Sequence, residues 1–235
     1  MRASTTAKRS QRLHLTRIER SEVVKNRLFA AAVKVVGEVG YAEASVSRIT
    51  RLAGVAQGTF YNHFPSRQDL LDQLLPTVGI EMLEFIRRKL KDVRSPVDRE
   101  AARFRAFFDF LMEMPEFMRI LNESDLFAPK GYAQHIERIS RDYVRALNKQ
   151  EVGSTFFSPE ELEVVVHIMM GARSYLSHHF SYANGRVHLP PAHVYTAYEK
   201  LFCSGLFATR KGASQDKRGG IPKREAKALA KPTTG

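Results

Sequence analysis

The sequence predicts an all-α protein of about nine helices, with an N-terminal three-helix helix-turn-helix domain and a larger helical C-terminal domain. Three observations lead to this fold class. Apolar residues recur at helical spacing along residues 21–207, no segment shows a sustained two-residue alternation, and one helix-start signal occurs three times. The chain has 235 residues, 43% of them hydrophobic and 26% charged, which is enough for a core and excludes global disorder.

The first helix is predicted over residues 21–39, and Gly40 ends it because glycine readily adopts the left-handed conformation that often follows a helix. A short helix follows Ser45 and stops at Gly54. A second short helix is predicted over residues 57–63. Two short helices joined by a tight turn that contains glycine are typical of a helix-turn-helix.

Three later helices share their start signal, a serine cap with an acidic residue three positions further on. They are predicted over residues 67–91, 96–114 and 159–180, and the last two also have proline at the first helical position. Pro76 and Gly79 lie inside the first of them and predict a bend there. The remaining helices are predicted over residues 115–122, 132–147 and 192–207.

The formal charge of +12 is concentrated at the two ends of the chain. Residues 1–20 carry six basic groups and one acidic group, and residues 208–235 carry eight and two. Both ends are polar and are predicted to be flexible, either as solubilising extensions or as arms that attract phosphate backbones. They leave residues 21–70 for the helix-turn-helix domain and residues 71–207 for the larger domain. The N-terminal arm adjoins the first helix and is the better placed to reach a DNA minor groove.

Several protein classes are excluded by the residues that are absent. One cysteine allows neither a disulfide scaffold nor a cysteine-cluster zinc site. No apolar run approaches the ~18 residues of a membrane span, and no signal-peptide core precedes the first helix. No phosphate-binding glycine loop or hydrolase motif is present. We therefore expect a soluble cytoplasmic protein that is not an enzyme, with no cofactor, no metal site and no membrane partner. The basic excess favours a nucleic acid partner.

The second helix of the helix-turn-helix has a face suited to DNA. On a helical wheel, Phe60 and Phe64 lie on one side, where they can fill the core of the small domain. The opposite side presents Gly58, Thr59 and Asn62. Glycine lets the backbone approach a phosphate, threonine can contact a thymine methyl group or a phosphate, and asparagine can pair with adenine. Each residue alone is more simply explained as solvated surface, but the combination favours DNA binding. The edges of this face carry Tyr61 and His63.

The stretch Gly40–Leu71 resembles the DNA-binding signature of the TetR (tetracycline-repressor-type) transcriptional regulators. The match departs at Thr50, where the family usually has alanine, and at Arg67, where lysine is usual. We expect Thr50 to face outward and Arg67 to keep a positive charge beside a phosphate. The matching segments are Ser45-Val46 with Ile49, Ala53-Gly54-Val55, Gly58-Thr59-Phe60-Tyr61, and His63-Phe64 before a capped helix.

The resemblance implies a homodimeric regulator, usually a repressor, that binds double-stranded operator DNA and leaves it when a small-molecule effector binds. It also implies that Gln57, Thr59 and Asn62 face bases, while Gly58 brings its backbone close to the DNA. The expected phosphate contacts are Ser47, Tyr61, His63 and Arg67.

The larger half is rich in aromatic residues and methionine, which favours either a plain helical core or a largely apolar effector cavity. A hydrophobic or acyl-type effector is our hypothesis, with Arg173, His167, His178 or His179 as candidate anchors for a polar head; surface or interface roles are the alternative. The candidate lining residues are Phe107, Phe110, Leu111, Met114, Phe117, Met118, Tyr132, Met169 and Arg173.

The last two long helices are predicted to pair with those of a second copy. Gly171 and Ala172 permit close approach, and apolar residues near the end of the domain add contact surface. The family resemblance implies a four-helix bundle at this interface. The apolar residues are Leu201, Phe202, Leu206 and Phe207.

Two other functions remain open from the sequence. One is a helical small-molecule-binding protein or enzyme without a DNA role. The other is a basic architectural DNA-binding protein that relies on its charged ends.

Overall fold

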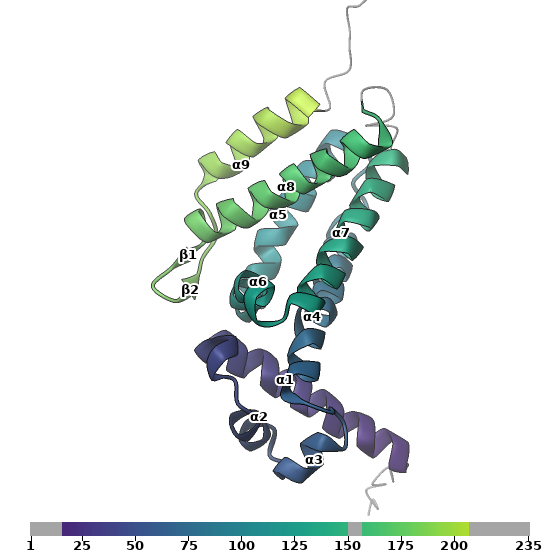
Figure 1. Cartoon of the computed structure of the whole chain (residues 1–235). Helices are drawn as coiled ribbons and strands as arrows, with labels where there is room; N and C mark the ends of the chain where they lie inside the picture. Colours follow the sequence, from purple (N-terminus) through teal and green to yellow (C-terminus); the bar gives the residue numbers. More distant parts are fainter. Residues whose placement is uncertain (1–15, 150–156, 207–235) are drawn as a thin grey trace, which may run out of the picture.

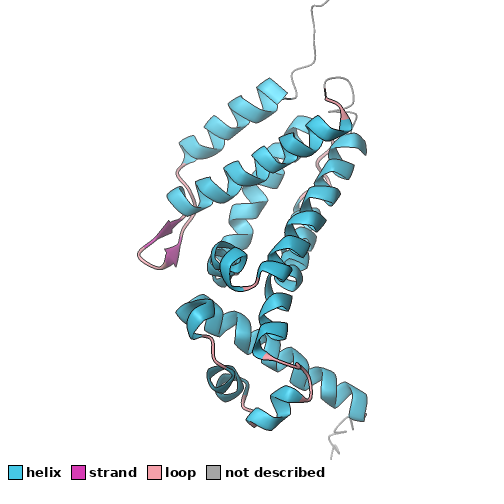
Figure 2. Cartoon of the chain, in the orientation of Figure 1, coloured by secondary structure: helices cyan, strands magenta, loops and turns pink. Residues whose placement is uncertain are grey.

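The computed structural model describes residues 16–149 and 157–206 and confirms the all-α fold class. Figures 1 and 2 show a small group of helices below a larger bundle, with α4 running between them. The two groups share one continuous apolar core. Across these residues, we find no helix that combines the length and the apolar character needed to cross a membrane.

The lower group contains a helix-turn-helix, as the sequence predicts. Ser45 caps α2 through a hydrogen bond from the Arg48 amide, and Gly54 ends it in the left-handed conformation with φ 66°. The third helix is shorter than predicted and ends at Tyr61. The helices of this group and the connecting helix are α1 Arg17–Glu43, α2 Val46–Ala53, α3 Gln57–Tyr61 and α4 Arg67–Lys89.

The first helix begins before its predicted start. Thr16 and Glu19 form a reciprocal capping box, so residues 17–20 are helical and do not belong to a flexible arm. At the other end, Gly40 has φ 84° and interrupts the helical backbone where the sequence predicts the end of the helix. The rest of the N-terminal arm, residues 1–15, and the whole basic tail, residues 208–235, lie outside the described residues.

Thr50, expected to face outward, is instead buried at 3% exposure. Its hydroxyl donates to the backbone carbonyl of Val46 at 2.9 Å, which satisfies its polar group inside the helix. The departure from alanine at this position therefore adds a hydrogen bond without placing a side chain on the surface.

The connecting helix α4 continues through Pro76 and Gly79 as one helix. A Cβ atom at Gly79 would overlap the ring of His135 on α7. Glycine at this position therefore allows α7 to pack closely against α4, which is a different role from the bend expected from the sequence.

The upper bundle contains the predicted helices with shifted ends. The sixth helix extends beyond its predicted end at Asn122, and the seventh begins at Pro129, three residues before its predicted start. The last predicted helix continues from α9 into the π-helical segment η1, and Phe207 lies outside the described residues. The elements are α5 Pro96–Glu113, α6 Glu116–Phe127, α7 Pro129–Lys149, α8 Pro159–Phe180, α9 Ala192–Tyr198 and η1 Glu199–Leu206.

A short β-hairpin follows α8 and was not predicted. Strands β1 Tyr182–Ala183 and β2 Arg186–Val187 pair antiparallel around Asn184 and Gly185, whose φ angles are 53° and 75°. Asn-Gly is the usual signal for a type I′ hairpin turn. The sequence does not predict the strands, because two residues in each leave no apolar alternation to recognise.

Candidate DNA-binding surface and effector cavity

The helix-turn-helix presents its predicted DNA-facing side to solvent on a rigid apolar support. Phe60 and Phe64 are fully buried, and their ring centroids are 5.5 Å apart. Tyr61, next to Phe60, is 58% exposed. The other predicted contacts also lie at the surface: Ser47, Gln57, Gly58 and Asn62 are exposed, and Thr59 and His63 are half-buried.

Arg67 makes backbone contacts within the domain that the sequence does not predict. Its guanidinium donates to the backbone carbonyl of Ala44 at 2.7 Å, to that of Ala42 at 3.2 Å and to that of Tyr41. These carbonyls follow the break in α1, where helix ends leave acceptors unpaired. Arg67 therefore ties the end of α1 to the start of α4 through its Nε and Nη2 atoms.

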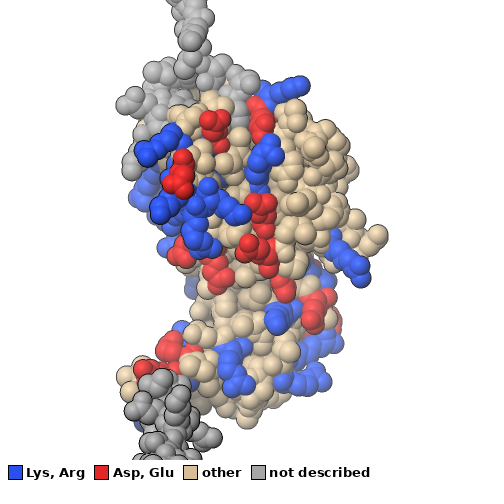
Figure 3. Space-filling view, turned by 180° about the vertical axis from the view of Figure 1, so that it is seen from behind, with Lys and Arg blue, Asp and Glu red and all other residues tan. Residues whose placement is uncertain are grey.

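A second arginine that the sequence did not single out braces the motif. Arg27 on α1 donates to the carbonyl of Ala53 at 2.5 Å, at the C-terminal end of α2. Its guanidinium lies beside Gly54, where a Cβ atom would approach it to 2.9 Å. The space-filling view shows further Lys and Arg side chains on the surface of this group of helices (Figure 3).

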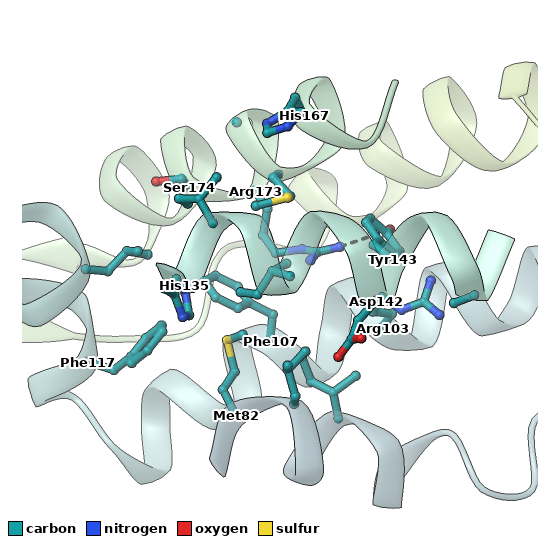
Figure 4. A pocket seen from close by; sticks show the side chains of 18 of the residues that line it. Met82, Arg103, Phe107, Phe117, His135, Asp142, Tyr143, His167, Arg173 and Ser174 are labelled. Carbon is teal, nitrogen blue, oxygen red and sulfur yellow. Dashed lines mark hydrogen bonds between the residues drawn. The ribbon is translucent and has the colours of Figure 1, made fainter. Parts of the chain in front are cut away.

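The upper bundle encloses a cavity of about 910 Å³ between α4, α5, α6, α7 and α8 (Figure 4). Four of the predicted effector residues line it: Phe107, Phe117, Tyr132 and Arg173. His167 and His178, suggested as anchors for a polar head, line it as well, but His179 does not.

The other five predicted effector residues lie outside the cavity lining. Phe110 packs against Phe85 and Phe117 in the core, with centroid distances of 5.7 and 5.3 Å. Met169 belongs to a separate apolar cluster with Val166. A buried helix has more than one apolar side, and its periodicity does not indicate which side borders an empty space. The remaining three, Leu111, Met114 and Met118, also pack in the core.

His135 lines the cavity and was missed in the sequence, although it lies beside Ile136 on the apolar side of α7. It is 3% exposed, and its ring centroid lies 6.3 Å from that of Phe117. Burial lowers the pKa of His135 to about 4. The imidazole is therefore neutral at physiological pH.

A buried polar cluster borders the same cavity. Glu100 on α5 accepts from Arg103 at 2.5 Å, from Arg173 at 3.4 Å and from the Tyr198 hydroxyl at 2.7 Å. Arg173 also donates to the Tyr143 hydroxyl at 3.3 Å. The sequence could have suggested only the Glu100–Arg103 pair, which is three residues apart on one helix face.

Ionisation within this cluster favours the charged guanidinium. Burial opposes the charge of Arg173, but Tyr143, Tyr198 and Glu100 outweigh it and raise the pKa of Arg173. Burial, followed by the negative charge of Glu100, raises the pKa of Tyr198. Burial and then Glu100 also raise the pKa of Tyr143. Both tyrosine hydroxyls therefore stay protonated, and Arg173 stays positive.

Helix α6 contacts both the cavity and the helix-turn-helix group. Phe117 lines the cavity. On the side facing α1, Glu123 accepts from the Tyr41 amide at 2.9 Å, and Arg119 donates to the Glu38 carbonyl at 2.8 Å. A shift of α6 at the cavity would therefore act directly on the end of α1.

Helix α8 carries an exposed apolar stripe. Val164, Ile168 and Tyr175 are 59%, 56% and 70% exposed, and their spacing places them on one face of the helix together with Gly171. Leu201 in η1 is 68% exposed.

Comparisons with known proteins agree with this architecture. Residues 28–74 match the family described as bacterial regulatory proteins, tetR family. The chain is 38% identical over 68 residues to the Fatty acid metabolism regulator protein of Bacillus subtilis (strain 168), covering 29% of this chain and 34% of that protein. It is 29% identical over 101 residues to the HTH-type transcriptional activator FasR of Mycolicibacterium smegmatis, covering 43% of this chain and 46% of that protein.

Both matches span less than half of the relative's length. A TetR-family transcriptional regulator from Pectobacterium atrosepticum has the same fold, with a TM-score of 0.61 and 22% identity over 83% of this chain and 99% of that one. The motif in α2 and α3, the sequence match over residues 28–74 and the fold of the whole bundle agree. Residues 28–74 are thus similar to the bacterial regulatory proteins of the tetR family, and the described bundle has the fold of a TetR-family regulator.

Proposed function

We propose that this chain is a homodimeric, sequence-specific transcriptional regulator, a repressor that leaves its operator when a small apolar effector binds. The observation that carries the proposal is the polar outer side of α3 and its C-cap. Gln57 and Thr59 lie on the helix, Asn62 follows as its C-cap, and Phe60 anchors the helix from within. Direct base readout needs such side chains on an element narrow enough to enter the major groove.

The contacts of α6 support a route from effector to DNA. An effector in the cavity would press on Phe117, and Arg119 and Glu123 on the same helix hold the end of α1. Displacement of α1 in each protomer would change the separation of the two reading helices. Because operator half-sites have a fixed spacing, that change would weaken DNA binding.

The effector class is supported by the cavity lining and by one relative. The lining includes aromatic and aliphatic side chains from five helices, as expected for an apolar ligand. The Bacillus relative is named as a regulator of fatty acid metabolism.

A reporter gene placed behind the chain's operator tests whether the chain represses or activates transcription. If it is a repressor, expression of the reporter must rise when the regulator is deleted.

Replacing Asn62 with alanine is expected to weaken operator binding by about 1–3 kcal/mol, because one side chain-to-base contact is lost. Binding to random DNA is expected to change little, since phosphate contacts dominate it. Titration of operator and random duplexes at several salt concentrations measures the affinity for each kind of DNA. Asn148→Ala, at an exposed position near the end of α7 in the upper bundle, is the matched control and should preserve the ratio of the two affinities.

An equal loss on operator and random DNA would show that Asn62 does not read a base. The same titration separates the other functions. An architectural protein would bind every duplex in a salt-sensitive manner, and a carrier or enzyme without a DNA role would bind none.

Replacing Ile168 with glutamate is expected to convert a dimer into a monomer, because it introduces a charge into the apolar stripe of α8. Light scattering coupled to size-exclusion chromatography measures the mass directly. Leu126→Glu is the matched control, since Leu126 is 75% exposed on α6, away from the stripe. A dimer that survives Ile168→Glu would move the interface elsewhere.

A further inference from the structure

We propose that Arg103 and Arg173 bind the carboxylate of a single-charged amphiphile whose apolar chain occupies the rest of the cavity, as in a straight-chain fatty acid. This inference rests on the proposed function, because it names the chemical class of the effector for the same cavity. It is carried by the charge, the hydrogen bonding and the shape of the buried polar cluster around Glu100.

The cluster has one positive charge more than it has negative charges. Arg103 and Arg173 are 9% and 7% exposed, and within residues 16–149 and 157–206 both form salt bridges to Glu100 alone. Asp142 also lines the cavity, but its carboxylate pairs with Arg87 at 3.2 Å. An uncompensated buried charge is costly, so a ligand that supplies one negative charge here gains affinity.

The cluster also has an unused donor. The Nε atom of Arg173 is buried and has no hydrogen-bond partner among the described residues. Its Nη2 atom contacts both Glu100 and the Tyr143 hydroxyl. Guanidinium groups present five N–H donors in a planar fork that matches the two oxygens of a carboxylate.

Aromatic rings restrict the direction from which a ligand can approach these donors. The guanidinium carbon of Arg103 lies 4.6 Å from the centroid of the Tyr143 ring, and that of Arg173 lies 5.5 Å from the same ring and 5.7 Å from Phe107. Rings over the guanidinium faces leave the edges for hydrogen bonding. A planar carboxylate accepts along such an edge.

The shape of the cavity places an apolar chain beyond the charged cluster. His135 and Tyr143 on α7 both line it and are eight residues apart, which is about 12 Å along a helix. Figure 4 shows Arg173, Tyr143 and Arg103 toward one end of the view and His135 and Phe117 toward the other. Burial keeps His135 neutral, so its imidazole adds no charge at this second end. Asp125 also lines the cavity, but it is exposed to solvent.

The excess of one charge also argues against more highly charged ligands. A phosphate monoester carries a charge of about −1.5 to −2 near neutral pH. Its second charge would have no buried partner in the cluster. A neutral ligand of the same length would leave the arginine charge and the Nε donor as they are. A monocarboxylate is therefore the class that the cluster fits.

The test compares dodecanoate, dodecanol, methyl dodecanoate and dodecanoyl-CoA on the full-length protein by isothermal titration calorimetry. Hexadecanoate and hexadecanol repeat the comparison at a greater chain length. Dodecanoate is expected to bind at least about tenfold more tightly than the alcohol or the ester, because it gains charge-assisted hydrogen bonds. Dodecanoyl-CoA, which has no free carboxylate, is expected to bind more weakly than dodecanoate.

Substitutions of the two arginines test whether they cause the preference for a carboxylate over an alcohol. Arg173→Gln and Arg103→Gln are expected to weaken dodecanoate binding by about tenfold to a hundredfold while dodecanol binding stays unchanged. Arg105→Gln is the matched control, because Arg105 lies on the same helix as Arg103 but pairs with Glu199 at the surface. Arg173→Lys retains the charge without the fork and is expected to fall between the wild type and Arg173→Gln.

Equal binding of acid and alcohol by the wild type, binding of none of the probes, or an unchanged acid-to-alcohol ratio in both arginine variants would overturn the proposal. The wild-type comparison does not depend on the folding of any variant. Failure of the regulator proposal is a separate result, since it would appear as a lack of specific operator binding whether or not carboxylates bind.

Discussion

Glu100→Gln is expected to lower the free energy of unfolding by about 3–5 kcal/mol, the cost of removing one partner from a buried ion pair. Glu100 is 1% exposed and is the carboxylate that both Arg103 and Arg173 contact. Glutamine has nearly the same shape, so little packing is lost. The two buried guanidinium groups are left without a negative charge. Urea unfolding monitored by circular dichroism measures the change.

The control for this change is Asp109→Asn on the same helix. Asp109 pairs with Lys89 at 3.4 Å on the surface, and such pairs contribute about 0–1 kcal/mol. If Glu100→Gln lowered the free energy of unfolding no more than Asp109→Asn does, water would have to reach the cluster and screen its charges. If the carboxylate site is correct, saturating dodecanoate should restore part of the lost stability, because binding to the folded state adds its own free energy.

Phe60→Ala is expected to lower the free energy of unfolding by about 3–5 kcal/mol and to abolish specific operator binding. Phe60 is fully buried and contacts Phe64 and Tyr61 at centroid distances of 5.5 and 5.2 Å. Helix α3 has five residues, and a helix this short depends on packing for its stability. Thermal unfolding and an operator titration measure the two effects.

Tyr61→Ala separates stability from DNA contact at the neighbouring position. Tyr61 is 58% exposed, so its loss is expected to change stability by less than about 0.5 kcal/mol. It should weaken operator and random DNA alike if the hydroxyl contacts a phosphate. Comparable instability in both variants would show that α3 is not anchored through Phe60 alone.

Much of the fold could be predicted because its signals are local. Ser45, Ser66 and Ser158 each accept a hydrogen bond from an amide three residues ahead. With positive φ angles, Gly40 interrupts α1 and Gly54 ends α2. Caps and terminating glycines act within one helical turn, so they can be recognised in the sequence. The capping box at Thr16 has the same form, but it lies within a stretch of dense positive charge that predicts a flexible arm.

The functional residues were harder to predict where they depend on distant partners. Arg67 was assigned to a phosphate because its position at a helix start is local information. The acceptors of its Nε and Nη2 atoms, the carbonyls of Tyr41, Ala42 and Ala44, lie more than twenty residues earlier. The physical reason is that an arginine side chain can satisfy any unpaired acceptor within reach, and only the packing of α1 against α4 brings these acceptors close.

The sequence alone determined the helical class, the helix-turn-helix and the polar side of its second helix, because periodicity and capping operate between neighbouring residues. Only the tertiary structure decided which apolar sides enclose the cavity and which fill the core. It alone brought Glu100 and Arg173, 73 residues apart, into one buried cluster. Side chains from different helices share an environment only after packing, and burial then sets the strength of their electrostatic interactions.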